Sequence, residues 1–144
     1  MAFQFALESV LRLRRSKQRQ QDLLLQKVNE QVNRLLRELQ DVAAEFARIY
    51  FSGKSESEVR GAELEFRNAQ CVVLAEHRMQ IEHRLRQARE QQAQASSQFQ
   101  RIWQRREVLE TLRGREHQSY LLEQGRREQR TQDDLFLFRK KHTR

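Results

Sequence analysis

Apolar residues recur at alternating spacings of three and four in the first third of the chain. The series consists of Leu25, Val28, Val32, Leu35, Leu39, Val42, Phe46 and Ile49. This spacing draws one apolar stripe along a helix and is typical of a seam that packs against a second helix. Continued towards the N-terminus, the same spacing meets Gln21, Gln18, Arg14, Leu11 and Leu7. Polar residues therefore interrupt a seam that predicts a coiled coil.

A second seam follows in the other two thirds of the chain. It begins in one register with Val59, Ala62, Phe66, Ala69 and Val73. After a slip of one residue it continues through Leu74, Arg78, Ile81, Leu85, Ala88, Gln92, Ala95, Phe99, Ile102, Arg106, Leu109 and Arg113. The length of this series predicts a second helix that is longer than the first.

The two seams predict an all-α fold, a long antiparallel two-helix coiled coil in the form of a helical hairpin. The chain has no proline to break a helix, and residues 52–55 read Ser-Gly-Lys-Ser, a turn signal. We expect a single coiled-coil domain over residues 1–144. Helix one should cover about 5–51, the turn about 52–55, helix two about 56–135, and a C-terminal tail 136–144.

The unequal helices predict an overhang. If the chain folds back near residue 54, Leu7 lies opposite about residue 101, and roughly 35 to 40 residues of helix two have no partner within the chain. This stretch contains Trp103, Leu109, Leu112 and Tyr120, and the apolar run 135–138. Apolar side chains without a partner indicate an interface with another protein or with a second copy.

The net charge of +8 is concentrated at the two ends of the chain. Residues 1–20 carry five cations against one acid, and residues 126–144 carry seven cations against three acids, so each end has a charge of +4. A hairpin brings these ends together in a basic tip that suits an acidic partner or a phosphate backbone. Plain solubility is the alternative explanation of the same charge.

The sequence offers little chemistry for catalysis or for cofactors. His77 and His83 are six residues apart, which is not a spacing that places two ligands on one helical face, and His117 and His142 have no cysteine nearby. Cys71 has no base placed beside it by sequence spacing. We therefore expect no enzyme, no metal and no cofactor. Without a long apolar stretch we also expect a cytoplasmic chain with no direct membrane insertion.

Both ends of the chain contain short motifs with a recognisable pattern. Residues 3–14 read Phe-Gln-Phe-Ala-Leu-Glu-Ser-Val-Leu-Arg-Leu-Arg. This start is similar to the F-x-F-x-L-E-x-V-L-x-L-R of the FliJ family of flagellar export proteins. Residues 107–112 and 128–134 are similar to its K-x-L-E-x-L and E-Q-K-x-L-D-E segments, although Gln132 and Asp134 replace the family's usual apolar residue and Glu. The resemblance extends over essentially the whole chain.

This resemblance implies a stalk-like component of the bacterial flagellar type III protein export apparatus. Its partners would be the hexameric flagellar export ATPase, whose ring assembly and turnover it promotes, and the export-gate membrane protein, with export chaperones as further candidates. It would work in the cytoplasm, peripherally associated with the export apparatus of the inner membrane. The residues expected to bind the ATPase are Leu7, Leu11, Arg14, Arg15, Gln18, Leu109, Leu112, Arg113, Leu121, Arg126, Arg127 and Arg130.

The resemblance also places a gate contact on the middle of helix two, at Val73, His77, Gln80 and Arg84. Three alternatives stay open. The chain could be the equivalent stalk of a virulence injectisome, a purely structural coiled coil, or a nucleic-acid-binding coiled coil that uses its two basic ends as phosphate clamps. The sequence contains no nucleic-acid recognition motif, so no nucleic acid is expected as a partner.

Overall fold

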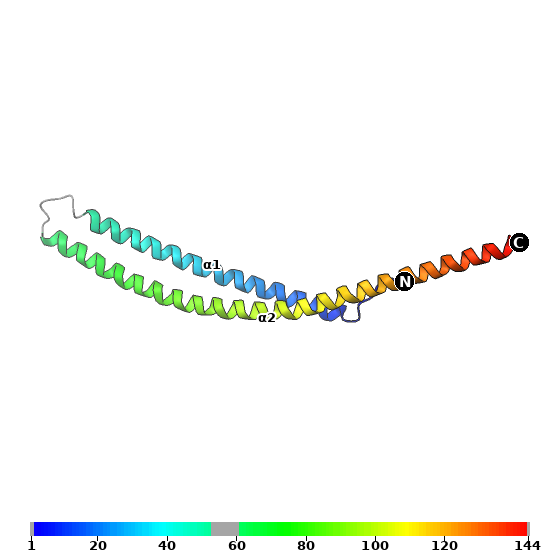
Figure 1. Cartoon of the computed structure of the whole chain (residues 1–144). Coiled ribbons are helices and arrows are strands. Elements are labelled where there is room, and N and C mark those ends of the chain that lie inside the picture. The colour runs from blue at the N-terminus through cyan, green and yellow to red at the C-terminus, as the bar shows by residue number, and fades with distance from the viewer. Residues whose placement is uncertain (1, 53–60, 144) are drawn as a thin grey trace. The chain divides into compact units, whose positions relative to one another are not determined.

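The computed structural model describes residues 2–52 and 61–143, which form two α-helices (Figure 1). Helix α1 covers Glu8–Ser52 and helix α2 covers Gly61–His142. The described residues contain no strand. The prediction of an all-α fold with a longer second helix is confirmed. The predicted turn at 52–55 is helical at Ser52, and its other residues, like Val59, lie outside the described residues.

The observed helix ends differ from the predicted ones. Helix α1 begins at Glu8, three residues later than predicted, where the Glu8 amide donates a hydrogen bond to the carbonyl of Phe5 at 3.1 Å. Helix α2 runs to His142, so most of the stretch predicted as a tail from residue 136 is helical. Its last turn holds Arg139, Lys140 and Lys141, and cations there interact favourably with the helix dipole.

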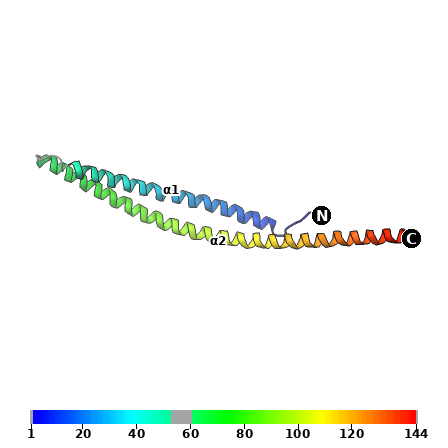
Figure 2. The same ribbon diagram turned by 45° about the horizontal axis from the view of Figure 1, so that its top comes forward.

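The contacts of the chain group into two units, and each unit contains a part of both helices. Unit 1 comprises residues 1–19 and 100–144, and unit 2 comprises residues 20–99. Within each unit α1 and α2 lie side by side (Figures 1 and 2). Side-chain contacts pair residue 8 with 113 and 18 with 106 in unit 1, and residue 29 with 92 in unit 2. In both units, therefore, the two helices are antiparallel.

The core of unit 2 follows the predicted seams. Its buried members are Val32, Leu35, Val42, Ile81 and Ala88, and Leu36, Leu39, Leu74 and Leu85 pack against them. Gln21, a polar seam position, is also buried, and its Nε2 donates hydrogen bonds to the Ala95 carbonyl and to Gln98 Oε1, both at 3.3 Å. A buried polar side chain bonded to the opposite helix fixes the register of the two helices.

The two registers predicted for helix two differ in burial. Ala62, Phe66, Ala69 and Val73 of the first register are all exposed, although Phe66, Ala69 and Val73 line one groove with Ile49 of α1. In the second register, which begins at Leu74, only Arg78 is exposed. The close packing of α2 on α1 therefore follows the second register.

Candidate protein-binding site

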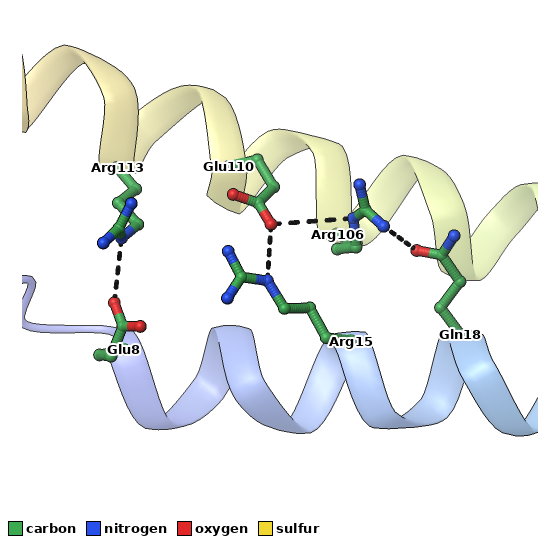
Figure 3. Close-up of polar contacts among 6 residues, drawn as sticks. All are labelled: Glu8, Arg15, Gln18, Arg106, Glu110 and Arg113. Atoms are coloured by element: carbon green, nitrogen blue, oxygen red, sulfur yellow. Dashed lines mark hydrogen bonds and ion pairs between the residues drawn. The ribbon is translucent and has the colours of Figure 1, made fainter.

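A polar cluster joins the two helices of unit 1 (Figure 3). Arg15 Nε on α1 donates a hydrogen bond of 2.8 Å to Glu110 Oε1 on α2. Arg106 lies one turn away on α2; its Nη1 donates to Gln18 Oε1 at 2.8 Å, and its Nε lies 3.9 Å from the same Glu110 oxygen. These contacts tie the two helices together at side chains that the sequence alone presented as separate charges.

The charges of this cluster stabilise one another. The hydrogen bond from Arg15 lowers the pKa of Glu110, and the nearby charges of Arg106 and Arg113 act in the same direction. The same hydrogen bond raises the pKa of Arg15. Both groups therefore hold their charges at neutral pH, and the cluster acts as a structural ion pair. It presents no acid or base poised for proton transfer.

The N-terminal segment before α1 is held on α2 by aromatic contacts. The Phe3 ring lies edge-on to His117, with centroids 4.9 Å apart, and 5.5 Å from the Tyr120 ring. The Arg113 guanidinium lies 5.9 Å from the centroid of the same ring and also pairs with Glu8 at 3.1 Å. These contacts hold Phe3 against residues 113–120 of α2.

These contacts correct the predicted length of the overhang. Leu7 lies near the level of residue 113 rather than residue 101, because its neighbour Glu8 pairs with Arg113. The prediction folded the chain back near residue 54, whereas Glu8 and Arg113 are equally far from a point at about residue 60 in the sequence. Each residue by which the predicted fold-back point is displaced moves the facing position on α2 by two residues. The N-terminal segment extends along α2 beyond Tyr120, since Ala2, Phe3 and Gln4 line one pocket with Glu123, Arg127 and Glu128. Among the described residues, the part of α2 beyond this pocket is 129–142, and the end of α2 extends past the N-terminus (Figures 1 and 2).

The residues predicted to bind the ATPase fall into two groups. One group lies within or along the contact between the helices, and consists of Leu11, Arg14, Arg15, Gln18, Leu109 and Arg113. Leu11 is fully buried, so in this conformation its side chain stabilises the helix pair and has no surface to offer a partner. The other group is exposed and consists of Leu7, Leu112, Leu121, Arg126, Arg127 and Arg130.

Near the end of α2 lies an apolar ring of side chains that we call the C-terminal collar. It consists of Leu135, Phe136, Leu137 and Phe138, each more than half exposed. Four consecutive residues at about 100° per residue point in all directions around a helix. The collar therefore offers apolar surface on every side, unlike a seam, which offers it on one. The sequence showed this run but not its freedom from contact with α1.

The residues predicted to contact the export gate are brought together on unit 2. Val73, His77, Gln80 and Arg84 are all exposed, and their spacings of four, three and four place them along one face of α2. This face adjoins the buried stripe of Leu74 and Ile81 without belonging to it.

The described residues contain no group of three or more His, Cys, Asp or Glu side chains that could hold a metal ion. Cys71 is a free thiol of intermediate exposure. Neither described helix has a stretch apolar and long enough to cross a membrane. The predicted site residues of the described part of the chain lie on helix surfaces and in the contact between the two helices.

Comparison with known proteins agrees with the resemblance seen at the two ends of the chain. The family model described as "Flagellar FliJ protein" matches residues 3–143, nearly the whole chain. No protein with curated function and no solved structure gives a significant match. Proteins of this kind are stalk-type structural components of flagellar export. The chain belongs to the FliJ family of flagellar proteins.

Proposed function

We propose that this protein is the stalk subunit of the flagellar export ATPase. The end of unit 1 enters the hexameric ring and promotes its assembly and turnover. The exposed face of Val73, His77, Gln80 and Arg84 contacts the export gate. The protein works in the cytoplasm at the inner-membrane export apparatus. The observation that carries this proposal is the C-terminal collar on a helix of a flagellar FliJ family member.

The collar favours a partner that surrounds the helix. A single helix lying alongside α2 would cover one side of the collar and leave the other apolar side chains in water. A ring of subunits covers all sides at once, because each subunit meets the helix from a different direction. About 25 cal/mol is gained for each Å² of apolar surface removed from water, so complete enclosure favours the ring over a lateral partner.

The face of α2 that packs against α1 at residues 106–113 does not continue as an apolar seam beyond Tyr120. The positions that follow in the same spacing are Gln124, Arg127 and Thr131. Gln124 donates to the Tyr120 hydroxyl at 2.6 Å, and the Thr131 hydroxyl donates to the Arg127 carbonyl at 2.9 Å. Polar side chains bonded within their own helix suit a helix that is not extended into a longer coiled coil by another chain.

Charge supports the same placement. Exposed cations lie on both sides of the collar along α2. Those before it are Arg126, Arg127 and Arg130, and those after it are Arg139, Lys140 and Lys141. A cationic helix end is steered towards an acidic pore lining, which raises the rate of association and makes it depend on salt.

The structure guides the choice of variants for a test. Arg15→Glu would set a second carboxylate against Glu110, so this substitution would disturb the helix pair as well as any partner contact. Leu137→Gln/Phe138→Gln alters exposed side chains only. Its matched control is Leu23→Gln/Leu24→Gln, an exposed pair on α1 in unit 2.

The experiment titrates each protein into the export ATPase and follows ATP turnover and ring assembly together. We expect the wild type and the control to stimulate both. The collar variant should need about tenfold more protein for the same effect, which corresponds to about 1.4 kcal/mol of lost binding. Equal stimulation by the collar variant would refute the role of the collar, and no stimulation by the wild type would refute the stalk function.

A further inference from the structure

The arginines of α2 in unit 1 divide into two sets. Eight arginines lie between residues 101 and 130. Arg106, Arg113 and Arg127 each have a carboxylate within 4 Å, from Glu110, Glu8 and Glu123 respectively. The other five have no side-chain hydrogen bond or ion pair within the described residues, and all are exposed: Arg101, Arg105, Arg115, Arg126 and Arg130.

The five unpaired arginines share one face of the helix. At about 100° per residue they fall within a sector of about 80°, centred about 110° away from the seam positions Ile102, Arg106 and Leu109. We call this face the arginine stripe. No glutamate lies at its centre; Glu123, at its edge, is paired with Arg127. The stripe is therefore a line of positive charge along one flank of α2, beside the face that packs on α1.

Apolar side chains lie within the same stripe. Val108 and Leu112 project from the sector that holds the arginines, Leu122 projects from about 20° beyond one edge, and all three are exposed. Glu116 lies equally far beyond the other edge. A groove beside Val108 and Leu112 is also lined by Trp103, Gln104, Glu107, Thr111 and Arg115. Trp103, the only tryptophan in the sequence, is 43% exposed. The stripe thus alternates apolar and cationic surface along the helix.

We propose that the arginine stripe docks an acidic amphipathic helix of a protein partner, as a third helix packed on the flank of α2. Such a helix would place apolar side chains against Val108, Leu112 and Leu122 and carboxylates against the flanking arginines. Arginine suits this role because its planar guanidinium binds carboxylates through two parallel hydrogen bonds. Apolar anchors with arginine beside them are the composition found at the centres of protein interfaces.

The surface fits a helix better than it fits other anionic partners. A groove that holds side chains suits a knob of a facing helix, whereas a phosphate backbone offers nothing apolar to fill it. A bilayer surface would need a broader apolar face than three aliphatic side chains spread over residues 108–122. The stripe is separate from the C-terminal collar. It shares Leu112, Arg126 and Arg130 with the residues expected to bind the ATPase, so the test below changes only Arg101, Arg105 and Arg115.

The test uses a designed, fluorescein-labelled helical peptide with a leucine face flanked by glutamates. Two companion peptides replace its glutamates by glutamine or its leucines by serine. Binding to the full chain is followed by fluorescence anisotropy. The stripe variant is Arg101→Glu/Arg105→Glu/Arg115→Glu, which avoids the residues expected to bind the ATPase. Its control, Arg34→Glu/Arg86→Glu/Arg89→Glu, makes the same charge change at exposed positions of unit 2.

We expect the acidic peptide to bind the wild type and the control variant alike, and the stripe variant at least about tenfold more weakly. Both companion peptides should also bind the wild type about tenfold more weakly. Equal loss in the stripe and control variants would overturn the proposal, because net charge would then explain the binding. Undiminished binding of the serine peptide would also overturn it. A third contrary result would be that the acidic peptide does not bind, while an RNA duplex or anionic phosphatidylglycerol vesicles bind the wild type and not the stripe variant.

Discussion

Replacing Ile81 by alanine should cost more stability than a typical change on this thin two-helix fold. Ile81 is fully buried and lies in the cluster of Val32, Leu35, Val42 and Ala88. The substitution removes three buried carbon groups, each contributing about 0.8 kcal/mol, so the transfer term alone is about 2.4 kcal/mol. The cavity left behind adds to this, and measured costs for such changes run from about 2 to 5 kcal/mol.

Urea unfolding followed by circular dichroism at 222 nm measures this loss. With a denaturant slope of about 1.5 kcal/mol/M, the midpoint should fall by about 1.6 M or more. Ile81→Val removes one carbon group and should cost about 1 kcal/mol. Met79→Ala, at a side chain 68% exposed two residues away, should change the midpoint little. A midpoint for Ile81→Ala within error of the wild type, or equal losses at positions 79 and 81, would refute the seam through Ile81.

Three further substitutions test polar and aromatic contacts. Gln21→Ala should lower the free energy of unfolding by about 1 kcal/mol through its lost hydrogen bonds, while Gln21→Leu should stay within about 1 kcal/mol of the wild type; a large loss with leucine would contradict a role in register alone. The pKa of Glu110 is lowered in the folded state, so its stabilisation is present above the unfolded pKa near 4.5 and is lost as the pH falls through the lower folded value. Glu110→Gln should therefore cost up to about 1 kcal/mol at pH 7 and progressively less as the pH falls below 4.5, and a cost that is unchanged at low pH would exclude the ion pair. Phe3→Ala should speed amide hydrogen exchange over residues 3–8 with little effect on unit 2, and unchanged exchange would show that the aromatic contacts do not hold the N-terminal segment.

The seams were predictable because two packed helices need apolar residues at alternating spacings of three and four. Leu11, Val32 and Val42 are buried as their spacing required, and so are Ile81 and Ala88 on the other helix. The polar interruption at Gln21 could not be assigned from the sequence, because a polar seam position either is buried and fixes the register or is exposed to another partner; its burial in the structure favours the first.

The pairing between the helices was not predictable with the same accuracy. Heptads repeat, so a hairpin can shift along its own seam with little change in apolar matching, and the turn signal at residues 52–55 set the facing positions several residues off. Arg15 and Arg113 were therefore expected to meet a partner, although their carboxylate neighbours come from the opposite helix. Spacing along one helix carries no information about which charge lies across from it.

The division of arginines into paired and unpaired sets could likewise emerge only from the structure. Arg113 and Arg115 are two residues apart, yet one pairs with Glu8 and the other is exposed on the arginine stripe. Two residues turn a helix by about 200°, which separates a seam position from an outward one. Sequence composition gives both residues the same charge and thus hides their different roles.

Site-specific crosslinking from the C-terminal collar tests the stalk proposal most directly. A Cys71→Ser/Leu137→Cys chain, labelled with benzophenone maleimide, is mixed with the export ATPase and irradiated during turnover, and the crosslinked ATPase residues are identified by mass spectrometry. The account predicts crosslinks to residues that line the pore of the ring, with none from a probe at the exposed Leu23→Cys. Crosslinks confined to the outer surface of the ring, or equal labelling from both probes, would contradict it.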